Sequence, residues 1–197
     1  MIRRPPRSTL SSSSAASDVY KRQEFHLQKK SQIFVVCPFI EESELVDIQA
    51  AENVFIEYKE KFKDYNVSIL HGKMSFDEKD QIMQDMKNGI VDILVSTVVI
   101  EVGIDIPNAT VMLVEHAERF GLTQLHQLRG RVGRGANKSY CILVRRGFTE
   151  TSKSRLIVME NTNDGFAIAD EDLKLRGPGE FFGLRQSGFF QFKIAKI

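Results

Sequence analysis

Three arginines interleaved with glycines form the segment of this chain that most clearly suggests chemistry. The segment reads Gln124-Leu125-His126-Gln127-Leu128-Arg129-Gly130-Arg131-Val132-Gly133-Arg134-Gly135. Arg131 and Arg134 are three residues apart, so a helical turn would place both guanidinium groups on one face. Two such groups can neutralise the charge that develops on a phosphoryl group during transfer, and Gln127, one turn earlier, can orient a water or a phosphate oxygen. The pattern predicts a catalytic arginine-finger site formed by Arg131, Arg134 and Gln127.

A structural alternative for this segment is the solvated basic end of a helix, because the helix dipole favours arginine near a C-terminus. Two glycines inside a helical turn would each cost about 1 kcal/mol relative to alanine. With no structural return for that cost, the functional interpretation is favoured.

Further polar residues follow two other predicted strands. Thr97 can contact a phosphate, Gly103 allows close approach of a backbone, and Asp105 can accept a hydrogen bond from a ribose hydroxyl or a guanidinium. Glycine and proline in the same stretch also fit a plain strand, turn and strand, so its spacing alone leaves both interpretations open. His71 and Gly72 follow another strand, where a lone histidine would be an ordinary loop residue.

The elements that position these residues alternate along the chain from Gln32 onward, which is typical of βαβ units in a parallel sheet covered by helices. Strands are expected at Ile33–Cys37, Val67–Leu70, Asp92–Ser96, Thr110–Glu115 and Tyr140–Val144. Helices are expected at about 43–62, 75–87, 123–131, 150–160 and 166–175, the second opened by a capping box of Ser75 and Glu78 and ended by Asn88-Gly89.

This fold class, an α/β parallel sheet covered by helices, has two consequences. Strands of a covered parallel sheet are buried on both faces. We therefore expect burial of Ile33, Val35, Ile69, Ile93, Val95, Val111, Leu113 and Ile142. Ligands in open α/β sheets bind at the carboxyl ends of the strands, so we expect the functional residues at that edge.

Composition limits the class of protein. With 42% hydrophobic and 27% charged residues, the 197-residue chain is typical of a folded globular domain. Cys37 and Cys141 lie in apolar runs without further ligands at metal-binding spacing, so they are interpreted as core thiols, and no metal site is predicted. No apolar run approaches the roughly 20 residues that span a bilayer, so we expect a soluble protein.

The first 23 residues differ from the rest. They contain a serine run and hold five basic residues and one acid, which leaves 22 basic and 25 acidic residues in the remainder. DNA binding therefore cannot be inferred from overall charge and needs a local basic surface. We predict that residues 1–23 are disordered. They resemble the read-through translation of a sequencing adapter, with an authentic presequence or flexible arm as the alternative, and are left out of the functional reasoning.

Four segments, in the same order along the chain, resemble motifs IV to VI of superfamily 2 helicases. Their residues are those typical of the bacterial RecG family: VCPFIEESE, HGKM, STVVIEVGIDIPNA and QLHQLRGRVGRG. The resemblance implies a second RecA-like motor domain over residues 24–148. It implies that Arg131 and Arg134 are arginine fingers with Gln127 as their polar partner. It also implies that Gly103 and Asp105 line the nucleotide, and that the residues contacting DNA include Thr97, His71 and Gly72.

The C-terminal part, residues 149–197, resembles the translocation motif that RecG shares with the transcription-repair coupling factor. In that motif a helical hairpin and a loop pass motor closure on to DNA, with residues that match Arg155 and Gln186. The segment Arg176-Gly177-Pro178-Gly179-Glu180 favours a RecG-type protein over the coupling factor, because the coupling factor typically has Ala-Gly-Asn at this place.

The resemblance further implies the cofactors and partners. ATP and Mg²⁺ would be held mainly by a first motor domain, and an N-terminal wedge domain would help to engage branched double-stranded DNA. We expect a monomer in the bacterial cytoplasm that branch-migrates Holliday junctions and regresses stalled forks in repair and recombination. The alternatives are a fragment of the coupling factor and a non-catalytic DNA-binding module.

The chain contains no G-x-x-x-x-G-K-[ST] phosphate loop and no Asp-Glu-x-His or Asp-Glu-x-Gln magnesium motif. An arginine finger stabilises a transition state that those groups must first assemble. We therefore predict negligible ATPase activity for the isolated chain, measured as phosphate release with and without DNA. Metal-dependent turnover by the purified chain would contradict this prediction.

Overall fold

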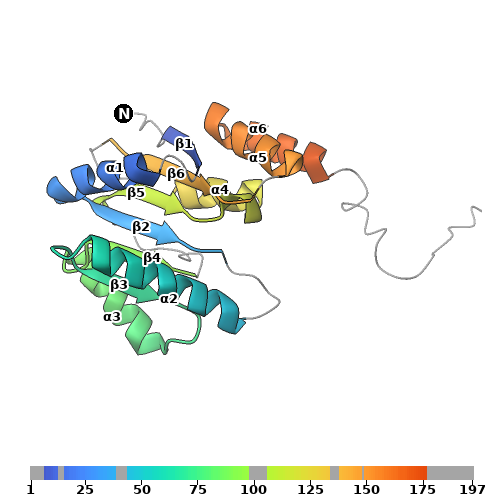
Figure 1. The fold of residues 1–197 in the computed structure, drawn as a ribbon. Coiled ribbons are helices and arrows are strands. Elements are labelled where there is room, and N and C mark those ends of the chain that lie inside the picture. The colour runs from blue at the N-terminus through green and yellow to red at the C-terminus, as the bar shows by residue number, and fades with distance from the viewer. Residues whose placement is uncertain are drawn as a thin grey trace, which may run out of the picture.

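One parallel sheet organises the computed structural model, which describes residues 7–12, 16–38, 44–97, 106–133, 138–147 and 149–176. Within these residues six strands lie in the order β1-β6-β5-β2-β4-β3, and every neighbouring pair is parallel (Figure 1). The strands are β1 (Arg7–Ser12), β2 (Gln32–Val36), β3 (Val67–Leu70), β4 (Ile93–Ser96), β5 (Ala109–Val114) and β6 (Tyr140–Arg145). The expected RecA-like α/β fold class is confirmed.

Helices connect the strands, as parallel strands require. They are α1 (Ala16–Gln28), α2 (Glu44–Lys61), α3 (Phe76–Lys87), the 3₁₀ helix η2 (Ala117–Arg119), α4 (Leu122–Arg129), α5 (Glu150–Asn161) and α6 (Gly165–Arg176). The five predicted helices are present, each with ends within two residues of the expected ones.

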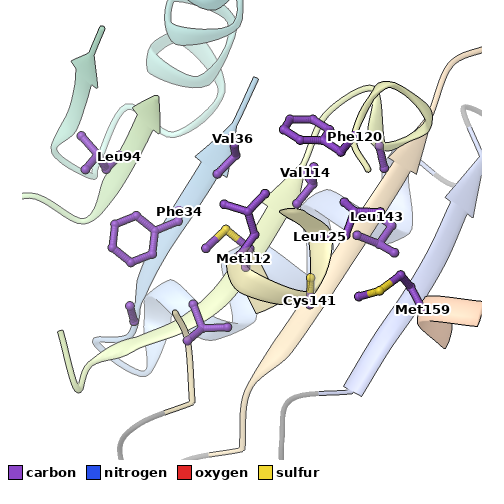
Figure 2. Packing of buried hydrophobic residues seen from close by; sticks show 14 of the residues in the cluster. Phe34, Val36, Leu94, Met112, Val114, Phe120, Leu125, Cys141, Leu143 and Met159 are labelled. Atoms are coloured by element: carbon purple, nitrogen blue, oxygen red, sulfur yellow. The ribbon is translucent and has the colours of Figure 1, made fainter. Parts of the chain in front are cut away.

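Alternating side chains along each strand divide the core into two layers. In β2, Phe34 and Val36 join a cluster with residues of α3, α4, α5 and α6, whereas Ile33 and Val35 join a cluster with residues of α1 and α2. Figure 2 shows the first layer, where Met112 of β5 and Cys141 of β6 lie near Leu125 of α4. Both faces of the sheet are therefore covered.

The strand residues expected in the core are buried with one exception. Ile33, Val35, Ile93, Val95, Val111, Leu113 and Ile142 are at most 2% exposed. Ile69 is only partly buried, because β3 is the last strand of the sheet and has a neighbour on one side alone.

The prediction of disorder for residues 1–23 is wrong for the part of them that is described. Residues 7–12 form β1, which pairs in parallel with β6, and residues 16–23 belong to α1. The sequence reasoning missed β1 because a serine-rich run carries no hydrophobic alternation. It missed the start of α1 because that helix contributes only a narrow apolar stripe, with Val19 and Tyr20 packing on the second core layer.

Local sequence determines the ends of α3. Ser75 Oγ accepts a hydrogen bond from Glu78 N at 3.3 Å, and Glu78 Oε2 accepts one from Ser75 N at 2.8 Å, so the predicted capping box is confirmed. Asn88 is the C-cap, and Gly89 follows with a φ of 75°, a conformation that glycine adopts at little cost.

The C-terminal hairpin is part of the same core. Helices α5 and α6 pack on each other and on α4 (Figure 1). Their Leu156, Met159 and Ile168 are at most 1% exposed and lie in the first core layer. Movement of the hairpin would therefore have to act on α4 directly.

Both cysteines are free and buried, as interpreted from the sequence, and burial raises the pKa of each thiol to about 12. Neither thiol is a reactive nucleophile near neutral pH. None of the helices in the described ranges combines the length and the apolar composition needed to cross a bilayer.

The sheet centre should contribute more stability than its edge. Ile93→Ala, at a residue that is 0% exposed, should lower the free energy of unfolding by about 2–5 kcal/mol, because it removes apolar contacts and leaves a cavity. Ile69→Ala, the same change on the adjacent edge strand, is the matched control and should cost less. Urea denaturation of both variants checks this, and equal losses would contradict the assignment of β3 as the edge.

Candidate functional site

The turn that carries Arg131 is not a continuation of α4. The helix ends at Arg129 with Gly130 as C-cap, Arg131 N donates to Leu128 O at 2.9 Å, and Gly133 has a φ of 80°. Arg131 therefore lies in a turn outside the helix, and the common face expected for Arg131 and Arg134 stays a prediction, because Arg134 lies outside the described residues. Gly133 has a structural role in this turn, since its φ of 80° favours glycine, so the expectation that the glycines of this segment have no structural role is wrong.

This turn lies at the amino edge of the sheet. Gly133 N donates to the carbonyl of Ala109 at 3.3 Å, and Ala109 is the first residue of β5. The expectation that all functional residues gather at the carboxyl edge is wrong for this segment, because α4 runs back along the sheet before the turn begins. Ile106, where the described chain resumes, lies only three residues before Ala109.

Arg131 and Gln127 have no protein partner in the described part of the chain. Arg131 is half-buried and Gln127 is exposed. Neither side chain makes a hydrogen bond or ion pair with any residue that the structure describes. Both are therefore available to a ligand at the amino edge. Arg134, Gly103 and Asp105 lie outside the described residues.

Arg129 behaves differently from Arg131, although the two are separated by one residue. Its side chain is 1% exposed and donates from Nη1 to the carbonyls of Met159 at 3.1 Å and Thr162 at 2.8 Å. Its Nη2 donates to His126 Nδ1 at 2.9 Å. Sequence reasoning grouped the three arginines of this segment, and the structure shows that one of them joins α4 to the hairpin.

His71 and Thr97 lie side by side at the opposite, carboxyl edge. Leu70 and Ser96, the last residues of β3 and β4, are partners in the sheet, and Thr97 N donates to Leu70 O at 3.2 Å. His71 Nδ1 and Thr97 Oγ1 are buried atoms without a hydrogen-bond partner in the described ranges. Buried polar atoms in proteins normally have a hydrogen-bond partner, so both atoms keep a capacity to bind a ligand or a water.

Gly72 has a partner within the domain. Its carbonyl accepts a hydrogen bond from Lys79 Nζ of α3 at 2.7 Å. This contact places a lysine of α3 next to the His71 loop. The carboxyl edge therefore has a basic group beside its unpaired polar atoms.

Arg155 of α5 points toward the segment that precedes α4. Its Nη1 donates to the carbonyl of Phe120 at 3.3 Å, and its Nη2 donates to that of Glu118 at 3.2 Å. Its Nε is buried and has no partner among the residues described. These contacts join α5 to the start of α4 and favour a transmitting role over direct contact with DNA. Gln186 lies outside the described residues.

Two acidic residues that follow β5, Glu115 and Glu118, bind the loop after β6. The sequence analysis did not predict this cluster. Glu118 accepts from the backbone N–H of Gly147 at 2.8 Å and of Arg146 at 3.2 Å, and Glu115 pairs with Arg146 at 3.3 Å. Burial acts to raise the pKa of Glu118, but these N–H donors together lower it. Charged residues directly after an apolar strand were the feature that could have predicted this cluster.

Other features of the described residues do not extend the site. No group of three or more His, Cys, Asp or Glu side chains among them could hold a metal ion. A shallow cavity lined by residues such as Tyr20, Phe62 and Tyr65 lies between α1 and the end of α2, away from the segments discussed above.

Comparison with protein families places most of the chain. Residues 17–136 match the model of the helicase conserved C-terminal domain, and residues 162–197 match that of the ATP-dependent DNA helicase RecG, domain 3, C-terminal. The first match begins at residue 17, inside the N-terminal segment of 23 residues. Together the two matches cover β2 to β5 and helix α6, and they leave β1, β6 and α5 outside.

Curated relatives named ATP-dependent DNA helicase RecG are similar over nearly the same range. The protein from Bacillus subtilis (strain 168) is 50% identical over 88% of this chain, and that from Streptococcus pneumoniae serotype 4 is 54% identical over 88%. The relative from Aquifex aeolicus is 50% identical over 93%. The chain spans about a quarter of the length of these relatives, with 26%, 26% and 24% of each covered.

Solved structures agree with this placement. A structure of RecG bound to a three-way DNA junction matches with a TM-score of 0.77 at 41% identity, over 91% of this chain and 23% of that one. Domain 2 of the Mss116p DEAD-box helicase, solved bound to an RNA duplex, matches with a TM-score of 0.56 at 18% identity, over 84% and 73% of the two chains. The second match shows the shared fold alone.

Buried His26 and partly buried His126 should make stability depend on pH. The pKa of His126 is lowered from 6.5, first by burial and then by Arg129, against an opposing effect of Asp164. The pKa of His26, which lies 3.0 Å from Thr110 Oγ1, is also lowered, by burial and by neighbouring cations. The unfolded chain therefore binds protons more readily than the folded chain in the window just below pH 6.5.

We expect the thermal unfolding temperature to fall as the pH is lowered through 6.5, before carboxylates such as Glu118 begin to titrate. Calorimetry across this window measures the effect. A variant with His26→Gln and His126→Gln should lose much of the dependence. An unchanged dependence in that variant would show that other groups cause it.

Proposed function

Because the chain belongs to the helicase conserved C-terminal domain family, we propose that it forms the second motor domain and hairpin of a RecG-type ATP-dependent DNA helicase. The complete protein would branch-migrate Holliday junctions and regress stalled replication forks. This chain supplies the arginine-bearing half of the motor, and a first motor domain would supply the phosphate loop and magnesium site.

The observation that carries the proposal is the separation of unpartnered polar groups onto two opposite edges of one sheet. The Arg131 turn lies at the start of β5, whereas His71 and Thr97 lie at the ends of β3 and β4. A strand of six residues spans roughly 20 Å, so the two groups serve separate ligands. A motor that hydrolyses a nucleotide at one edge and holds DNA at the other requires this division.

The amino edge fits the charge of a nucleotide. Arg131 is half-buried and unpaired within the described residues, and Gln127 lies one helical turn earlier. In the proposed site Arg131 and Arg134 would bind the phosphate oxygens, with Gln127 orienting them. Gly103 and Asp105 would line the sugar and base. ATP with Mg²⁺, when bound, would supply the phosphoryl group that is transferred to water.

The carboxyl edge fits the DNA backbone. Thr97 Oγ1 and His71 Nδ1 have no partner in the described ranges, and both can donate to a phosphate oxygen. Because both atoms are buried and Thr97 is 2% exposed, this contact would require the chain that covers them to move aside. Gly72 permits close approach at the same loop, and Lys79 adds positive charge beside it. Contacts to the backbone would position the DNA and carry no sequence preference.

The hairpin would transmit motor closure to the DNA. Arg155 binds the carbonyls of Glu118 and Phe120, immediately before α4, so a change in the position of α4 is passed to α5. Gln186 would act further along, in the loop after α6. We further propose that the complete protein acts as a monomer on branched double-stranded DNA in the bacterial cytoplasm, with an N-terminal wedge domain.

Two alternatives make different predictions. A coupling-factor fragment would belong to a protein with an RNA-polymerase-binding region, and the relatives found over most of this chain carry the RecG name instead. A non-catalytic DNA-binding module would bind DNA without any dependence on ATP. Restoring the first motor domain separates this second alternative from the motor function.

The test uses a completed helicase, in which this whole chain, with β1 and α1 included, replaces the matching quarter of the Bacillus subtilis relative. Its ATPase should be stimulated by DNA. Arg131→Ala should lower ATP turnover by ~10³–10⁵-fold while DNA binding survives, because a finger acts on the transition state. Arg119→Ala, at an exposed arginine of η2, is the matched control and should leave turnover unchanged.

Arg155→Ala in the same protein should keep much of the DNA-stimulated ATPase while junction unwinding falls. The reason is that losing the contact that passes motion from α4 to the hairpin need not affect ATP hydrolysis itself. Both rates are measured on a branched DNA substrate. If Arg155→Ala loses ATPase in proportion to unwinding, its transmitting role is wrong. DNA binding without any stimulated ATPase in the unsubstituted protein would favour the binding module.

A further inference from the structure

Arg129, a buried residue of α4, donates hydrogen bonds to the carbonyls at the C-terminal end of α5, the first helix of the hairpin. Arg129 is the last residue of α4, yet its Nη1 donates to the carbonyls of Met159 and Thr162, at the C-terminal end of α5. The last carbonyls of a helix have no partner within the helix, and a cation there also interacts favourably with the helix dipole. Arg129 therefore caps α5 across the interface.

The surroundings of Arg129 restrict how α4 and the hairpin can be placed. Its Nη2 donates to His126 Nδ1 at 2.9 Å, which requires that nitrogen of His126 to be unprotonated. A Cβ atom at Gly165, the first residue of α6, would lie 3.1 Å from His126 Nε2. Arg129 and His126 thus contact the end of α5 and the start of α6 together.

The position of Arg129 in the sequence links this contact to the chemistry. Arg131 follows two residues later, in the turn that Gly133 attaches to the start of β5. Arg155 and the hydrogen bond from Thr123 to Asp172 hold the other end of α4. Among these contacts between the hairpin and the two ends of α4, the hydrogen bonds of Arg129 are the ones nearest in sequence to Arg131.

Packing alone does not require an arginine at this place. A buried charge loses its hydration, and an apolar side chain of similar volume often stabilises a core at least as well. The guanidinium instead provides directional hydrogen bonds to two carbonyls at the end of α5 and to His126 of its own helix. Such bonds specify one orientation of the hairpin relative to α4.

We propose that Arg129 is a positioning residue that joins the Arg131 turn to the hairpin, so that the nucleotide state at the amino edge sets the position of the hairpin. This inference rests on the proposed helicase function and assigns the coupling to a residue beside the nucleotide edge. Arg129 touches neither nucleotide nor DNA. Its effect is on how much movement each hydrolysis event produces.

The test is the number of base pairs unwound per ATP hydrolysed by the completed helicase on a branched DNA. Arg129→Met removes the donors while keeping most of the volume, and should lower this ratio by about tenfold or more, because hydrogen bonds to a charged group are lost. The KM for ATP should change little. Lys174→Met, a matched loss of an exposed cation on α6, should leave the ratio unchanged.

Two further variants keep the test decisive if Arg129→Met does not fold. Arg129→Lys retains the cation but not the fork of donors, and should give an intermediate ratio. Gly165→Ala leaves Arg129 in place and adds a Cβ atom 3.1 Å from His126 Nε2, so the ring that accepts from Arg129 must shift, and the ratio should also fall. A ratio equal to that of Lys174→Met in all the variants that fold overturns the proposal.

Different results would overturn the proposed helicase function and the proposed role of Arg129. If the unsubstituted completed helicase shows no DNA-stimulated ATPase, the proposed function is wrong. If it hydrolyses ATP and unwinds DNA normally and Arg129→Met lowers both rates equally, Arg129 is a structural residue and only the further inference is overturned.

Discussion

Coverage of both faces of a parallel sheet is the constraint on which the rest of this structure depends. Parallel neighbours cannot be joined by tight turns, so their connections cross over the sheet, and most of them place a helix on one face. The alternating residues of β2 show the result, with Phe34 in one layer and Ile33 in the other. The loops lie at the two ends of the strands, and His71, Thr97 and the turn of Arg131 lie there.

Helix α4 occupies the central place in this arrangement. Its apolar side, with Leu125 and Leu128, packs into the first core layer, and its other contacts are made with α5 and α6. It is therefore in contact with both the sheet and the hairpin. A short helix in this position can pass a displacement between them, because packed interfaces move between discrete arrangements and do not deform continuously.

The hydrogen-bond partners of the arginines indicate their different roles better than their spacing along the sequence does. Arg129 and Arg155 donate to backbone carbonyls of neighbouring segments, whereas Arg131 makes no hydrogen bond with the described residues. A half-buried guanidinium without a partner carries a desolvation cost that a bound anion would offset. The hydroxyl of Thr97 at the other edge is likewise without a partner among the described residues.

The sequence by itself determined the fold class and most of the elements. Apolar runs and capping residues act locally, which is why Ser75 and Glu78 predicted the start of α3 and why the strand residues, apart from Ile69 at the edge, lie in the core. The ordered motifs also identified Arg131 and Thr97 as candidates. Serine-rich β1 was missed because its place depends on pairing with β6 and not on its own pattern.

Only the tertiary structure decided which edge each candidate occupies and what each arginine contacts. The approach of Gly133 to Ala109 places the Arg131 turn at the amino edge, and the carbonyls that bind Arg129 lie some thirty residues away in sequence. Spacing along a chain limits which residues share a helical face, but it contains no information on contacts between separate helices. Those contacts arise when the helices pack, and here they bury Arg129 between α4 and α5, whereas Arg131 makes no such contact within the described residues.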